Sequence, residues 1–160
     1  MRQPKHTIKI FVSFVFAAAF AIAGISLSAT APSGPVVQVQ VPGTVSQTVT
    51  HLRRMVSHNG MMVMGELHQG KVLAMTGLHV QSETLFVGNP TVGKKLFSAN
   101  PGVGLVVPVR VNIFKDANGK TVVSYIPPSK LLQSYGNKKV DRVAMMLDQK
   151  LHNMVTMLSR

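Results

Sequence analysis

One α+β domain behind an N-terminal export segment is the architecture predicted for this chain of 160 residues. The stretch 85–125 runs through an apolar strand, a Gly-Asn-Pro turn, a short amphipathic helix, a Gly-rich turn and two strands around an Asn-Gly turn. The chain then ends in a long amphipathic segment, 140–158, whose apolar stripe is typical of a helix packed on a sheet. This order of strands and helices predicts one compact unit.

The first 31 residues have the pattern of a secretory signal. Arg2, Lys5 and Lys9 make a basic start without acids, residues 10–27 are mostly apolar, and small residues follow them. The pattern predicts export, so we expect the rest of the chain in the periplasm or cell envelope. If the segment were not cleaved, residues 10–27 would act as a membrane anchor, because about 20 apolar residues span a bilayer.

A first strand and a helix are predicted next. Residues 36–41 suit a strand, which Pro42-Gly43 ends. Thr44 or Ser46 can cap the following helix by accepting free backbone N–H groups, and Gly60 suits the left-handed position at its end. The apolar face of this helix consists of Val45, Val49, Leu52 and Val56.

The middle of the chain predicts two strands separated by a short helix. Residues 61–67 form the second expected strand, 69–75 a short helix, and 83–87 the third strand. Pro90 fits the first turn of another helix, because its missing N–H would have no partner there in any case.

A helix, a turn and a long strand should follow. We expect the helix at 90–99 to pack Leu96 and Phe97 inward. Residues 100–104 contain two glycines and a proline and predict a flexible turn. The mostly apolar segment 105–114 predicts a long strand.

The remaining sequence predicts a hairpin and a C-terminal helix. Asn118-Gly119 tolerates the positive φ of a tight turn, so residues 121–126 should return as the last strand, which Pro127-Pro128 ends. The final helix has a continuous apolar stripe made of Val140, Val143, Ala144, Leu147, Leu151, Met154, Val155 and Leu158. We expect this stripe to cover one face of the sheet.

Composition excludes several classes of function. The chain has no cysteine, which excludes disulfides, thiol catalysis and Cys-ligated metal sites. Residues 32–160 carry fourteen Lys and Arg against five acids, a net charge of +9, but the bases are scattered and aromatic residues are few. Together with export, this argues against a nucleic-acid partner. Acid unfolds proteins mainly through paired carboxylates, so the shortage of acids predicts tolerance of an acidic periplasm. Attraction to anionic envelope surfaces is the alternative interpretation.

Several motifs between Thr44 and Tyr135 together resemble one known family. They are the helix end at Gly60, Glu66-Leu67-His68 at the end of the second strand, the Leu-Phe-Val-Gly-Asn-Pro segment at 85–90, Gly93 and Leu96, Val107-Pro108, Gly119 and Ser124-Tyr125. This set resembles the bacterial and archaeal family called domain of unknown function 302 (DUF302). The family pattern has an acid directly before the histidine, whereas this chain has Leu67 there and Glu66 one position earlier.

The resemblance implies a fold and an assembly but no settled activity. It implies a two-layer α+β sandwich in the order β-α-β(4)-α, with an antiparallel-rich sheet, helices on one face and frequent association as a homodimer. The chain would then consist of a signal or anchor helix at 1–31, a linker with the first strand at 32–43, and the DUF302-like domain at 44–160.

His68 is the first candidate for a functional side chain. An imidazole at a strand end suits proton transfer or metal binding, and Met62 and Met64 would share its face if the strand ran on. Thioethers with an imidazole select Cu(I), so these three residues predict a copper-type metal site or a redox-accessory protein. The alternative is that His68 bonds to the backbone and the methionines fill gaps in the core.

Asn89 is the second candidate, because it lies where a strand opens onto a helix N-terminus. Free N–H groups there bind anions, although Asn89 can equally cap the helix. We expect His68, Asn89, Arg110 and Tyr125 to lie near one pocket for a small ligand or an envelope partner. Paired carboxylates, a phosphate loop and a nucleophile elbow are not evident in the sequence, so the leading prediction is a non-enzymatic binding domain with no identified cofactor.

Overall fold

The computed structural model describes residues 36–160. The expected signal or anchor at 1–31 and the start of the linker lie outside the described residues. Within residues 36–160, none of the helices is both long and apolar enough to span a bilayer.

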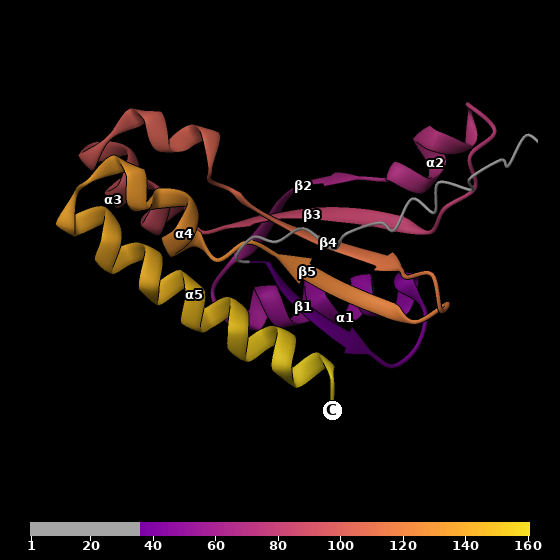
Figure 1. Ribbon diagram of the computed structural model, residues 1–160. Coiled ribbons are helices and arrows are strands. Elements are labelled where there is room, and N and C mark those ends of the chain that lie inside the picture. Colours follow the sequence, from indigo (N-terminus) through magenta and orange to yellow (C-terminus); the bar gives the residue numbers. More distant parts are fainter. Residues whose placement is uncertain (1–35) are drawn as a thin grey trace, which may run out of the picture. The chain divides into compact units, whose positions relative to one another are not determined.

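A five-stranded antiparallel sheet forms one layer (Figure 1). Its strands lie in the spatial order β1-β5-β4-β3-β2, and every neighbouring pair is antiparallel. Their bounds are β1 Val37–Val41, β2 Met62–Leu67, β3 Ser82–Gly88, β4 Val109–Lys115 and β5 Thr121–Tyr125. β1, which the sequence placed before the main domain, pairs along its length with β5 and is therefore part of the sheet.

Two long helices, α1 (Val45–His58) and α5 (Lys138–Leu158), form the second layer on one face of this sheet (Figure 1). The predicted two-layer α+β fold in the order β-α-β(4)-α is thus confirmed. Shorter helices lie in the connections: α2 (Gln69–Ala74), α3 (Pro90–Ala99) and α4 (Pro128–Leu132), with 3₁₀ turns η1 (Pro101–Leu105) and η2 (Gln133–Tyr135). α3 and α4 lie beside the N-terminal half of α5, and α2 lies at the opposite end of the sheet.

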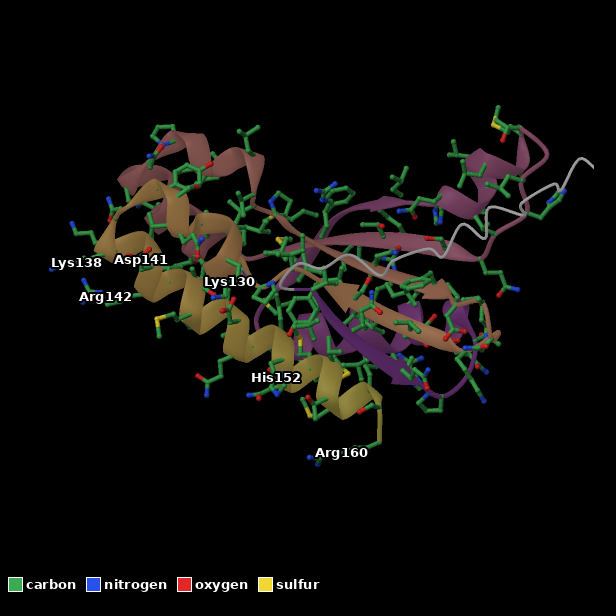
Figure 2. All side chains as sticks on the ribbon, viewed as in Figure 1. Lys130, Lys138, Asp141, Arg142, His152 and Arg160 are labelled. Carbon is green, nitrogen blue, oxygen red and sulfur yellow. The ribbon has the colours of Figure 1, made fainter. Side chains whose placement is uncertain are left out.

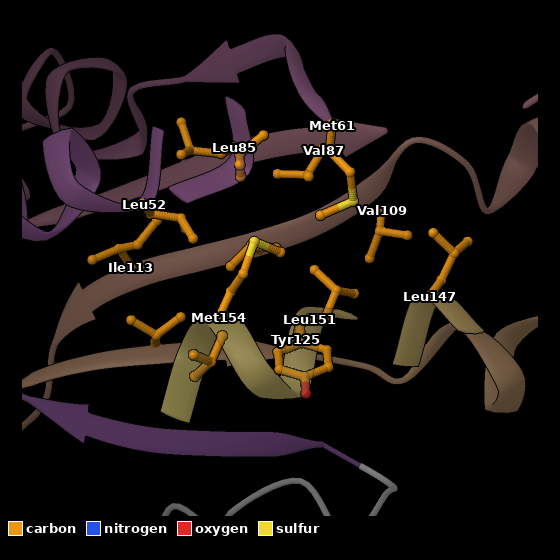
Figure 3. Packing of buried hydrophobic residues seen from close by; sticks show 14 of the residues in the cluster. Leu52, Met61, Leu85, Val87, Val109, Ile113, Tyr125, Leu147, Leu151 and Met154 are labelled. Atoms are coloured by element: carbon orange, nitrogen blue, oxygen red, sulfur yellow. The ribbon is translucent and has the colours of Figure 1, made fainter. Parts of the chain in front are cut away.

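The core lies between the sheet and these two long helices (Figure 3). Alternate residues of the central strands, such as Leu85 and Ile113, are fully buried against Leu52 of α1 and Met154 of α5. The charged side chains of Lys138 and Arg142 are exposed on the outer side of α5, away from the sheet (Figure 2). The amphipathic stripe predicted for this helix is therefore confirmed.

Local sequence signals also explain both ends of α1. Thr44 caps the helix: its hydroxyl accepts the N–H of Gln47 at 3.2 Å, and the Gln47 amide oxygen accepts the N–H of Thr44 at 2.9 Å. This reciprocal pair satisfies two N–H groups that the helix itself cannot. Gly60 beyond the helix adopts φ +66°, which favours glycine because it has no Cβ.

The segment 105–114 differs from the long strand predicted there. The strand β4 begins only at Val109, because residues 101–105 form the 3₁₀ turn and Pro108, which follows a cis peptide bond, has no N–H to donate to a sheet ladder. Leu105 is 92% exposed. The apolar composition of this segment was misleading, because its glycines and prolines decide the backbone.

One further prediction about this end of the domain was wrong. Phe97 does not pack inward with Leu96; it is 45% exposed and its ring lies against Gly104. Successive helical residues are about 100° apart, so both cannot face the core. The prolines at 127–128 end β5 as predicted, but Pro128 also begins the helix α4, where a proline at the first position is favourable.

A shift of register in β2 decides which way its side chains point. Val63 pairs with Val87 of β3, but the next pair is Gly65 with Phe86, so Met64 is an extra residue on its strand. Such a β-bulge reverses the alternation of side chains beyond it. Glu66 therefore faces the helical layer, on the same side as the buried Leu85 with which it pairs.

Candidate functional site

A cavity of about 240 Å³ opens between the end of β3, the start of β4, α3 and α5. Its lining is almost entirely apolar: Met64, Val87, Gly88, Asn89, Val92, Gly93, Leu96, Phe97, Val107, Pro108, Val109 and Leu147. Figure 3 shows Val109 and Leu147 together at one end of the core, with Val87 nearby. The cavity is therefore an extension of the hydrophobic core that opens to the surface.

The Gly-Asn-Pro segment shapes the mouth of this cavity. Asn89 caps α3, since its side-chain oxygen accepts the N–H of Val92 at 2.9 Å, and its amide nitrogen donates to the carbonyl of Gly60. Gly88 leaves room for Met64: a Cβ added at position 88 would lie 2.9 Å from the Met64 sulfur. The Met64 thioether is half-exposed and flexible, and it lies across this edge of the cavity.

The four side chains predicted to share a pocket do not meet. Asn89 lines the apolar cavity, whereas His68 lies beyond the far end of β2. Arg110 is exposed and pairs with Phe86, on the face of the sheet that points away from α1 and α5. Tyr125 is buried in the core beneath α5 (Figure 3). Val92 and Leu147 also line the cavity. They could not be identified as site residues from the sequence, because apolar residues that line a cavity show the same pattern as core residues.

Tyr125 has a titration that follows from its burial. Removal of its phenol from water raises the pKa of Tyr125 above its ordinary value of about 10, and the carboxylate of Asp148 raises it further. Both effects keep the phenol neutral in the folded protein. We therefore assign Tyr125 to the packing of the core.

A second constellation combines His68 with two carboxylates. Its Nδ1 lies 3.4 Å from Oε2 of Glu83 and 3.9 Å from Oε1 of Glu66, while Arg53 of α1 pairs with the other oxygen of Glu66. The three side chains are partly buried. No acidic partner for His68 was evident from the sequence, because the β-bulge and the pairing of β2 with β3 create these contacts.

The predicted grouping of His68 with Met62 and Met64 is not formed. The Met64 side chain lies against Gly88, whereas His68 contacts Glu83, and these two positions of β3 are roughly 16 Å apart at the usual rise per strand residue. Alternation would have placed His68 and Met64 on one face, but the bulge at Met64 moves the residues after it to the other face.

Basic side chains that are scattered in the sequence gather in a shallow groove between α3 and α5. The groove is lined by Thr91, Lys94, Lys95, Ser98, Ala99, Lys139, Arg142 and Val143. Lys94 and Lys95 therefore line this groove and not the apolar cavity that Asn89 lines. Figure 2 places Arg142 on the outer side of α5, near Lys138.

Comparisons with known proteins agree with this fold. A crystal structure titled as an uncharacterized conserved protein DUF302 from Bacillus stearothermophilus superposes with a TM-score of 0.72, at 19% identity, over 78% of this chain and 98% of that chain. No curated protein sequence matches the chain. The family model described as "Domain of unknown function DUF302" matches residues 37–158, from β1 to the end of α5. This chain therefore belongs to the DUF302 family.

Proposed function

We propose that this protein is an exported, non-enzymatic DUF302 domain that binds one small and largely apolar molecule in the cavity between α3, β3, β4 and α5. The observation that carries the proposal is the cavity itself, which is continuous with the core, lined by apolar side chains and open to solvent. Apolar surface in contact with water is unfavourable at about 25 cal/mol per Å². A ligand that covers it gains that free energy.

The volume restricts the class of ligand. At about 240 Å³, the cavity exceeds the roughly 150 Å³ that accommodates benzene in an engineered protein core, and it is smaller than the roughly 300–1,000 Å³ typical of drug-sized ligands. A bicyclic aromatic or a short branched alkyl chain fits this range. Asn89 uses its amide in the cap of α3 and in the bond to Gly60, so the lining offers few polar groups to a ligand.

Gly93 provides a direct test of ligand binding. It lies in α3 and lines the cavity, and a side chain built there meets open space. Gly93→Leu should therefore occupy the cavity without a clash, and it should favour the helix because leucine is a better helix former than glycine by roughly 0.8 kcal/mol. The matched control is Thr91→Leu, which adds leucine to the same helix at an exposed position on the basic groove.

The probe is 1-naphthylamine, a neutral bicyclic aromatic amine whose fluorescence emission shifts in apolar surroundings. We expect saturable binding by the wild-type protein and by Thr91→Leu, and at least tenfold weaker binding by a folded Gly93→Leu variant. Equal binding by all three proteins would show that the probe binds elsewhere and would contradict the proposal.

Export is tested separately from ligand binding. The basic, apolar and small-residue pattern of residues 1–31 supports it. Fractionation of the source cells should place the protein in the periplasm or envelope, and its intact mass should correspond either to loss of about 30 residues or to a retained anchor. A full-length product in the cytoplasm would refute export and leave the cavity proposal standing.

A further inference from the structure

We propose that Glu66, His68 and Glu83 form a binding site for a divalent first-row transition metal ion, best suited to Zn²⁺. One ligand atom from each of these side chains lies within 4.8 Å of the other two. They converge from β2, from the residue after it, and from β3. This site is separate from the apolar cavity, and nothing in it depends on a ligand there.

The donor set fits such an ion. Carboxylate oxygens and imidazole nitrogens are both common ligands of Zn²⁺, with bond lengths of about 2.0–2.2 Å. Soft Cu(I) prefers thioethers and thiolates. The Met64 thioether of β2 lies against Gly88, whereas His68 contacts Glu83. The geometry thus points to a harder metal than the sequence predicted, with Glu66 and Glu83 replacing Met62 and Met64 as ligands.

The distribution of charge favours the binding of a cation at this point. The whole chain has only five acids against seventeen Lys and Arg, yet two of the acids lie side by side here. Arg53 pairs with Glu66, while the ionic contact of Glu83 within residues 36–160 is with His68 alone. Two neighbouring carboxylates repel each other, and the repulsion grows as solvent is excluded. A divalent cation between them converts this repulsion into attraction.

The surroundings also resemble those of a metal site. Arg53 holds one oxygen of Glu66, which leaves the other oxygen, 3.9 Å from the imidazole, directed at the site. Such outer partners of a ligating carboxylate fix its orientation. The His68 side chain is 43% exposed, so an ion can enter and complete its coordination with water.

The experiment is a Zn²⁺ titration of the purified protein after treatment with a chelator, followed by competition with a chromophoric zinc indicator. We expect one equivalent of Zn²⁺ to bind, and both His68→Ala and Glu83→Gln to weaken it at least tenfold. His152→Ala is the matched control, because His152 is exposed on the outer side of α5; this variant should bind zinc like the wild type.

A second readout separates a metal site from an ordinary ion pair. If the cluster binds zinc, the ion should raise the melting temperature of the wild type, because a ligand that binds only the folded state stabilises it, and it should not do so in Glu83→Gln. Zinc binding that survives both ligand substitutions, or a wild-type melting temperature unchanged by zinc, would overturn the proposal. Loss of Cu(I) binding in Met64→Leu together with no zinc binding would favour the thioether site instead.

Discussion

Tyr125 links the packing of the core to the behaviour of the protein at high pH. Its ring is buried between β5 and α5 (Figure 3), and its pKa is raised by burial and by Asp148. Because the folded state binds the phenolic proton more tightly than the unfolded chain does, this contribution to stability is complete below about pH 10 and is lost as the pH rises through the higher folded pKa.

We predict that Tyr125→Phe flattens this alkaline loss. The free energy of unfolding, measured by urea denaturation from pH 8 to pH 11.5, should fall more steeply for the wild type than for Tyr125→Phe above pH 10. Tyr135→Phe is the control, because its partly exposed hydroxyl donates to the carbonyl of Gly102. Parallel curves for Tyr125→Phe and the wild type would show that the phenol does not stay neutral in the fold.

Among the elements, α5 shows how far a sequence pattern determines packing. Its apolar stripe predicts the buried residues because a helix of 21 residues repeats its face regularly. β2 shows the opposite case: its alternation is interrupted by a bulge at Met64, so the partners of His68 could not be predicted from spacing. The start of β4 was missed for a related reason, since the chain at 101–108 follows its prolines and glycines rather than its apolar content.

We predict a sharp contrast between two positions of α5. Leu151 is 2% exposed in the core, so Leu151→Ala should lower the free energy of unfolding by about 2–5 kcal/mol. Met145 is 65% exposed, so Met145→Ala should change it by less than about 0.5 kcal/mol. Urea denaturation followed by circular dichroism measures both, and similar losses at the two positions would mean that α5 does not pack as described.

For the whole molecule, the fold was predictable and the sites were only partly so. The order of elements along the chain, the helical layer and the family follow from patterns that extend over many residues. The cavity and the Glu66–His68–Glu83 cluster depend on side chains from separate segments that meet only after β2, β3, β4 and α3 have assembled. Asn89 was found because its position at a helix start is visible in the sequence, whereas Leu147 reaches the cavity from α5.

The scarcity of carboxylates leads us to predict acid tolerance. Only five acids are present in the chain, so few native contacts are lost when the pH falls. The melting temperature at pH 3 should lie within about 10 °C of its value at pH 7, a difference that corresponds to only a few kcal/mol in a domain of this size. Unfolding by pH 3 at room temperature would contradict this interpretation of the composition.

Methyl NMR spectra of the protein titrated with 1-naphthylamine test the proposed ligand site at the level of single side chains. If the probe binds in the cavity, chemical-shift changes should be confined to methyl groups that line it, such as those of Val92, Val107 and Leu147. The core methyl groups of Leu52 and Val123 should not shift. Shifts at residues on the sheet face that points away from α1 and α5, or none at saturating probe, would show that the cavity is not a binding site.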